Sequence, residues 1–230
     1  MVSPVLVALD FPTAGEAKDI ARDLAPHVGG FKVGLELLFS EGPHIVAEIA
    51  AIGLPVLADA KLHDIPNTVR GAARALGRHG ARWVTVHAGG GQAMVEEAVA
   101  GLASGADGPA GVLVVTVLTS LDDDDLASVG IPRRVGDQVE AMTDLAARSG
   151  AEGVVCSPSE VGQARMASAD LIVVTPGIRD DGGDSHDQKR VTTAEEAIAA
   201  GADHLVVGRA ITRAADPVEA AQALGRRLSR

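Results

Sequence analysis

The chain has 230 residues, of which 47% are hydrophobic, and its 31 acidic against 20 basic side chains give a net charge of −11. A chain of this length can bury one large core, and its acidic excess argues against nucleic acid or an anionic membrane as the main partner. The single cysteine, Cys156 in the apolar run GVVCS, excludes an internal disulfide and favours a buried thiol in a reducing cytoplasm. No apolar run approaches membrane-spanning length, and the N-terminal residues lack the basic start of a signal peptide.

Short β-branched runs recur along the whole chain and predict eight strands. They lie at 5–9, 30–34, 55–61, 83–87, 112–118, 153–157, 171–176 and 204–208. The segments between them, such as 15–28, 68–80, 138–150 and 193–201, have helical periodicity and are rich in Ala, Leu, Glu and Arg. Alternating strands and helices predict a parallel sheet covered by helices, and eight strands are the number that closes a (β/α)8 TIM barrel. We expect one such domain over residues 1–230.

An open, doubly wound α/β sheet is the alternative arrangement of the same elements. Its dinucleotide-binding forms carry a Gly-x-Gly-x-x-Gly turn after the first strand. This chain instead has LDFPTAGEA at 9–17, so the barrel is favoured.

Local signals mark where the helices begin and end. Capping residues precede three helices: Thr13 with Glu16, Thr192 with Glu195, and Asp216 with Pro217 and Glu219. Three helices run through Gly-Ala into the next strand, and the glycines that fit this left-handed turn are Gly80, Gly150 and Gly201. The acidic run 122–125 predicts a solvated helix start rather than a cation site.

Polar residues collect where the predicted strands end, which is the face of a barrel that carries active sites. They are Asp10, Lys32, Asp59, Lys61, His87, Thr119, Ser120, Ser157, the turn 176–179, Gly208 and Arg209. Asp59 and Lys61 lie two apart on one strand, so their side chains share a side, and Lys32 could extend them into a line of alternating charge. A structural ion pair is the alternative for Asp59 and Lys61. By its spacing, Asp64 predicts a cap for a helix that begins near Asn67.

The last two units predict a phosphate site, because barrels often bind phosphate with the loops after strands seven and eight. Arg179 follows the first of these strands, and Gly208 and Arg209 follow the second at the start of a helix. The alternatives are a surface salt bridge for Arg179 and solvation of the helix by Arg209. The long polar segment 177–191 fits a lid, with a disordered excursion as the alternative.

Seven motifs together resemble one family along the full chain. They are VALDFP, FKVGLELL, DAKLHDIPNTV, VTVHA, LTS, TPGIR and VVGRAITRA, and the family is bacterial orotidine 5′-phosphate decarboxylase. The Asp-x-Lys-x-x-Asp core also occurs in related phosphosugar enzymes, whereas the HDIPNTV continuation belongs to the decarboxylase. Ala60 departs from the expected Leu, and it points away from the site.

The resemblance implies cofactor-free decarboxylation of orotidine 5′-phosphate to uridine 5′-phosphate and CO2, the last step of pyrimidine nucleotide synthesis. It implies that Lys61 protonates C6 within an array formed by Lys32, Asp59, Lys61 and Asp64. The implied substrate-binding residues are these four with Asp10, Ile65, Thr68, Thr119, Arg179, Gln188, Gly208 and Arg209. It further implies a homodimer in which Asp64 and Thr68 enter the site of the other subunit, which replaces the capping role for Asp64.

Two other functions remain to be weighed. A metal-dependent phosphosugar decarboxylase or aldolase would need a carboxylate where this chain has Lys32, since an ammonium repels a metal ion. A non-catalytic phosphate-binding barrel would not need every catalytic position to be filled. His63 and His87 lack metal-ligand spacing, and we expect them in packing or hydrogen bonding.

Overall fold

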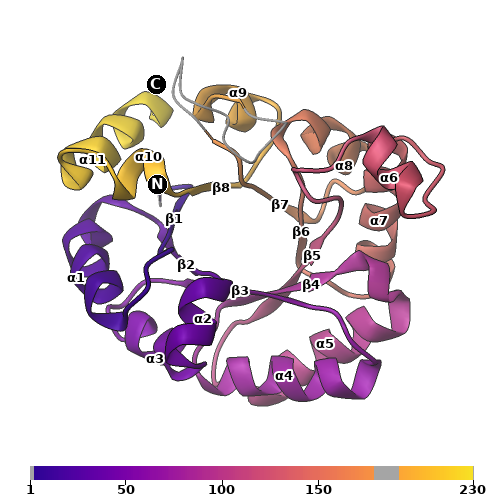
Figure 1. Cartoon of the computed structure of the whole chain (residues 1–230), viewed down its shortest axis with the longest axis horizontal. Coiled ribbons are helices and arrows are strands. Elements are labelled where there is room, and N and C mark those ends of the chain that lie inside the picture. Colours follow the sequence, from indigo (N-terminus) through magenta and orange to yellow (C-terminus); the bar gives the residue numbers. More distant parts are fainter. Residues whose placement is uncertain (1–2, 179–191, 230) are drawn as a thin grey trace.

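The computed structural model describes residues 3–178 and 192–229, and in them a closed barrel of eight parallel strands is surrounded by helices (Figure 1). The strands are β1 Val5–Ala8, β2 Gly30–Val33, β3 Val56–Leu62, β4 Trp83–His87, β5 Gly111–Val115, β6 Gly153–Val155, β7 Ile172–Thr175 and β8 His204–Val207. Each strand pairs with the next, and β1 pairs with β8 to close the sheet. The predicted (β/α)8 barrel is confirmed.

The helices follow the strands in chain order. They are α1 Ala14–Leu24, α2 Leu35–Glu41, α3 His44–Ala50, α4 Pro66–Arg78, α5 Gln92–Gly105, α6 Asp123–Ser128, α7 Val135–Arg148, α8 Val161–Ala167, α9 Ala194–Ala199, α10 Arg209–Thr212 and α11 Pro217–Leu228, with 3-10 turns at Ala25–His27, Ala88–Gly90 and Pro158–Glu160. None of the helices in the described residues is long and apolar enough to cross a membrane.

Both faces of the sheet are buried, which explains why the strands are almost continuously apolar. One set of side chains fills the barrel interior: Leu6, Ala8, Leu57, Trp83, Leu113, Val174 and Val206. The alternate strand residues pack outward against the helices in a larger cluster. The strand predicted at 112–118 extends too far towards the C-terminus. β5 ends at Val115, and Leu118 lies beyond the sheet and is exposed.

Two of the three predicted caps are confirmed. The side chains of Thr13 and Asp216 accept hydrogen bonds from the third residue of α1 and α11 respectively. The pairing of Thr192 with Glu195 is wrong by one residue, since Thr193 caps α9 in a reciprocal pair with Glu196. Thr192 instead forms a bridge with Ile178, which keeps it extended and delays the helix.

Other local predictions also hold. The acidic run begins α6, whose cap is a reciprocal pair between Asp122 and Asp125. Gly80, Gly150 and Gly201 have φ angles of 81°, 72° and 109°, which are the left-handed values expected after a helix.

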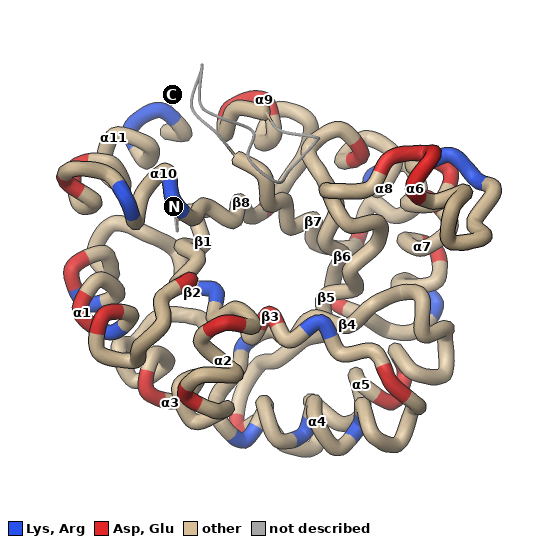
Figure 2. The backbone as a smooth tube through the Cα atoms, in the orientation of Figure 1, with Lys and Arg blue, Asp and Glu red and all other residues tan. Residues whose placement is uncertain are grey.

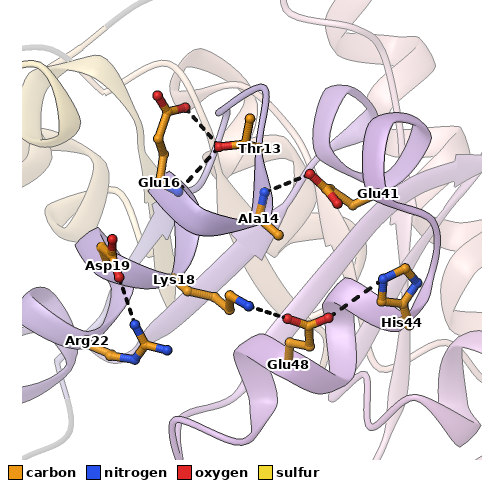
Figure 3. Close-up of polar contacts among 9 residues, drawn as sticks. All are labelled: Thr13, Ala14, Glu16, Lys18, Asp19, Arg22, Glu41, His44 and Glu48. Atoms are coloured by element: carbon orange, nitrogen blue, oxygen red, sulfur yellow. Dashed lines mark hydrogen bonds and ion pairs between the residues drawn. The ribbon is translucent and has the colours of Figure 1, made fainter.

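Most charged side chains belong to the outer helices and loops, but a few lie where β1, β2 and β3 open at the barrel mouth (Figure 2). The turn after β1 is fixed by polar contacts among α1, α2 and α3 (Figure 3). Glu41 accepts a hydrogen bond of 2.8 Å from the amide of Ala14, and Lys18 lies 2.6 Å from Glu48. These contacts hold the start of α1 against its neighbours and so position the preceding loop, which carries Asp10.

Candidate active site

A cavity of about 290 Å³ opens at the carboxyl ends of the strands. Its charged lining residues are Asp10, Lys32, Asp59, Lys61 and Arg209. Its apolar lining residues include Ala8, Leu57, Val115, Val155, Val174 and Val206. A ligand in this cavity would therefore meet both fixed charges and hydrocarbon, an arrangement in which electrostatic interactions are stronger than in water.

The cations and anions of the cavity form one connected line. The Nζ atom of Lys32 lies 3.1 Å from Oδ1 of Asp10 and 3.4 Å from Oδ2 of Asp59. The same Asp59 oxygen lies 2.7 Å from Nζ of Lys61. The prediction that Lys32 extends Asp59 and Lys61 into an alternating line is confirmed.

The line stabilises the charged form of its buried members. Burial alone would raise the pKa of Asp59, but the ammonium groups of Lys32 and Lys61 outweigh it and hold that pKa below its usual value. Burial alone would lower the pKa of Lys32, yet the carboxylates of Asp59 and Asp10 raise it above its usual value. Both groups are therefore ionised at neutral pH.

Thr85 belongs to the same cluster, although it was not among the residues predicted from the sequence. Its hydroxyl donates to Oδ1 of Asp59 at 2.9 Å and accepts from the amide of Lys61 at 2.9 Å. The available signal was its position on β4, two residues from His87 and therefore on the inward side. Val115, Val155 and Cys156 also line the cavity without having been predicted there, although the thiol of Cys156 is buried as predicted.

Asp64, Ile65 and Thr68 are exposed and lie outside the set of described residues that line the cavity. Asp64 does not cap α4, because the capping position belongs to Ile65 and the helix begins at Pro66. Oδ1 of Asp64 instead accepts a hydrogen bond of 2.6 Å from the next amide, that of Ile65. The capping interpretation drawn from spacing is thus wrong.

The predicted phosphate end is described in part. Thr119, Gly208 and Arg209 line the cavity together with Pro176 and Gly177. Helix α10 has only four residues, so its dipole is small and the Arg209 side chain is the main source of positive charge. Arg179, Gln188 and most of the predicted lid at 177–191 lie outside the described residues.

Other polar residues at the strand ends do not reach the cavity. Ser157 is fully buried and bonds to Glu160, and Ser120 is exposed. The rings of His63 and His87 lie 5.5 Å apart, and burial, with the nearby His63 and Lys61, lowers the pKa of His87. Within 3–178 and 192–229, His, Cys, Asp and Glu side chains form no group of three or more that could hold a metal ion.

Comparison with known proteins gives a consistent result. A family model described as orotidine 5′-phosphate decarboxylase / HUMPS family matches residues 3–224. The orotidine 5′-phosphate decarboxylase of Anaeromyxobacter sp. (strain K) is 49% identical over 221 residues, which cover 96% of each chain. That of Novosphingobium aromaticivorans is 45% identical over 224 residues, covering 97% of this chain and 98% of the relative. The crystal structure of orotidine 5′-phosphate decarboxylase from Lactobacillus acidophilus superposes with a TM-score of 0.88 at 36% identity, covering 99% of this chain and all of that one.

Proposed function

Because the chain belongs to the orotidine 5′-phosphate decarboxylase / HUMPS family, we propose that it converts orotidine 5′-phosphate into uridine 5′-phosphate and CO2, the last step of pyrimidine nucleotide synthesis. The observation that carries the proposal is the line from Asp10 through Lys32 and Asp59 to Lys61 along one wall of the cavity. It offers a cation beside an anion in a partly apolar cavity, which suits a reaction that exchanges a carboxylate for a carbanion and then a proton.

In the proposed reaction the bond between C6 and the carboxylate breaks, CO2 leaves, and the electron pair stays on C6. The ammonium of Lys61 stabilises that pair and donates the proton that forms the new C–H bond. Asp59 holds Lys61 by the 2.7 Å contact and lies where the substrate carboxylate would be repelled before it departs. The proposed reaction uses no cofactor.

The remaining residues are proposed to bind the rest of the substrate. Asp10 and Lys32 would contact the ribose hydroxyls, and Thr119 would contact the pyrimidine. Gly208 and Arg209, which follow β8 beside β1, would hold the phosphate, together with Arg179 and Gln188 from the segment outside the described residues. Binding energy from this remote phosphate would lower the activation barrier of the reaction at C6.

We propose that the active site is completed by a second copy of the chain. Asp64, Ile65 and Thr68 are exposed at the start of α4, where the family resemblance requires substrate contacts. Two apolar side chains support a contact surface, since Ile65 is 68% exposed and Phe39 on α2 is 85% exposed. In a homodimer, Asp64 would add the fourth charge to the partner's line, and Ile65 and Thr68 would contact the partner's substrate.

The metal-dependent phosphosugar reaction fits the charge line less well. A divalent cation would need carboxylate ligands, and the Lys32 ammonium already occupies the space 3.4 Å from Asp59. We also propose that the whole chain forms one decarboxylase domain. A cytoplasmic location stays a prediction, based on the single buried thiol.

The function is tested by adding orotidine 5′-phosphate to the purified protein in excess EDTA and following CO2 release and the ultraviolet change to uridine 5′-phosphate. We expect rapid turnover, and a loss of about a thousandfold or more in Lys61→Ala, because the proton donor and the cation beside C6 are both removed. No turnover in EDTA, with activity on a phosphosugar once Mg²⁺ is restored, would assign the chain to the metal-dependent reaction instead.

A further inference from the structure

Lys61 has an unusual backbone conformation for a residue in a strand. Its φ angle is 46°, and it is the one residue other than glycine with a positive φ in the described part of the chain. Such a conformation is strained in a residue that carries a side chain, and it persists only where neighbouring groups enforce it. A neighbouring group must therefore hold the backbone of Lys61 in this conformation.

The strand pairing explains where this strain arises. Between Ala58 and Leu62 the register of β3 against β4 shifts, so the regular ladder is interrupted where Asp59 and Lys61 lie. The amide of Lys61 donates to the Thr85 hydroxyl at 2.9 Å rather than to a strand carbonyl. The Thr85 side chain, and not a strand carbonyl, thus accepts the hydrogen bond of the Lys61 amide where the strand register shifts.

The same hydroxyl also fixes Asp59. A hydroxyl has one proton and two lone pairs, so it can accept from Lys61 and donate to Asp59 at the same time. Oδ1 of Asp59 receives the Thr85 proton at 2.9 Å, while Oδ2 faces the ammonium groups of Lys61 and Lys32. The carboxylate is therefore held by both oxygens, and its plane cannot turn without breaking the bond to Thr85. Thr85 itself is 1% exposed.

We propose that Thr85 is a positioning residue for the reaction, in which one buried hydroxyl locks both the strained backbone of Lys61 and the orientation of Asp59. This inference rests on the proposed function. Thr85 acts through these two residues, so its loss leaves the charges in place but lets their geometry relax. Preorganised charges are effective only while their positions are fixed, so turnover depends on the hydroxyl more than binding does.

The test compares Thr85→Val, which keeps the shape but removes the hydroxyl, with Thr85→Ser, which restores it. For Thr85→Val we expect kcat to fall about a hundredfold or more while KM for orotidine 5′-phosphate changes less than about threefold. Thr85→Ser should return to within about fivefold of wild type. Thr143→Val makes the same change at a fully buried threonine on α7, away from the charge line, and is the matched control.

Two kinetic results would overturn the proposal. One is a folded Thr85→Val that keeps the wild-type kcat, and the other is a Thr85→Ser as impaired as Thr85→Val, which would indicate packing alone. If Thr85→Val does not fold, Thr85→Ala removes the same hydroxyl with less crowding and is measured in its place.

A second readout needs no substrate. Loss of the hydrogen bond that Thr85 donates should raise the pKa of Asp59, seen by carbon-13 NMR titration of its carboxyl in the ligand-free protein. An unchanged titration in Thr85→Val would contradict the proposed lock. If the wild-type protein failed to turn over orotidine 5′-phosphate, the proposed function would fall, and this titration would still decide whether Thr85 fixes Asp59.

Discussion

At the scale of single residues, His204 affects the stability of the fold. It lies at the amino-terminal end of the barrel strands, away from the cavity. It is the first residue of β8, and its ring lies 5.2 Å from that of Trp83, the first residue of β4. Its Nδ1 atom is buried without a hydrogen-bond partner among the described residues. Burial lowers the pKa of His204, and this effect exceeds the opposing influence of Asp203, so the ring is held neutral.

This environment predicts a pH dependence of folding stability. The folded pKa of His204 lies below the unfolded value of about 6.5, so between the two the unfolded chain binds more protons and acid destabilises the fold. We expect the free energy of unfolding in urea to fall less between pH 7.5 and pH 5.5 in His204→Gln than in wild type. Each protein is referenced to its own value at pH 7.5, which removes the packing loss. Because the pKa of His87 is also lowered, part of the decrease should remain in the variant. Identical decreases in both proteins would show that His204 contributes nothing to this dependence.

The sequence could predict which residues share a side, but not how they are held. Asp59 and Lys61 follow the two-residue period of a strand, which any extended segment obeys, and Lys32 follows from its place on the neighbouring strand. The same period places Thr85 on the inward side of β4 but does not reveal its two hydrogen bonds, because these depend on the register shift of β3 against β4. Such a shift is a property of two paired strands and is not encoded in the spacing of either one.

At the scale of elements, α4 and α5 pack unusually closely through glycine. A Cβ atom added at Gly101 on α5 would lie 2.3 Å from the carbonyl oxygen of Arg70 on α4, and one at Gly105 would lie 2.2 Å from that of Arg74. The two helix backbones are therefore in contact, with no space for a methyl group. This contact fixes the position of α4, whose first turn carries Thr68.

The close packing predicts that replacing glycine with alanine has opposite effects on folding stability at Gly101 and at Gly71. Gly101→Ala should destabilise the fold by about 1–3 kcal/mol, because the clash with α4 outweighs the gain in helix propensity. Gly71→Ala, on α4 with no atom within 4 Å of the added methyl, should instead stabilise by up to about 1 kcal/mol. The midpoints of urea unfolding measure both changes. A Gly101→Ala protein as stable as Gly71→Ala would mean that the two helices can separate without loss.

Element boundaries were predictable where the signal is local. Thr13 and Asp216 cap their helices as expected, since a cap depends only on the three residues that follow it. The cap of α9 fell one residue later because Thr192 pairs with Ile178, a contact between segments that are distant along the chain. Local rules therefore fail where a tertiary contact competes for the same residue.

At the scale of the whole molecule, the closed barrel was predictable because eight similar units leave few other arrangements. A fixed handedness and neighbouring pairing put each strand beside the next, and the polar residues after the strands then meet at one face. The role of Asp64 could not be predicted in this way. Asp64 is exposed and is not among the described residues that line this chain's cavity, so its proposed role depends on a second copy of the chain.

The proposed sharing of sites predicts that two defective variants will restore each other. Lys61→Ala lacks the proton donor, and Asp64→Asn lacks the charge proposed to enter the partner's site. When the two chains are expressed together, a hybrid dimer has one site with both residues intact and one with both changed. Random pairing should then recover about a quarter of the wild-type activity. Lys61→Ala paired with Lys32→Ala is the control, because both residues belong to the same chain's charge line and no hybrid site is intact. Recovery no greater than in this control would place Asp64 outside the partner's site, whereas recovery above it requires that each site draw on both chains.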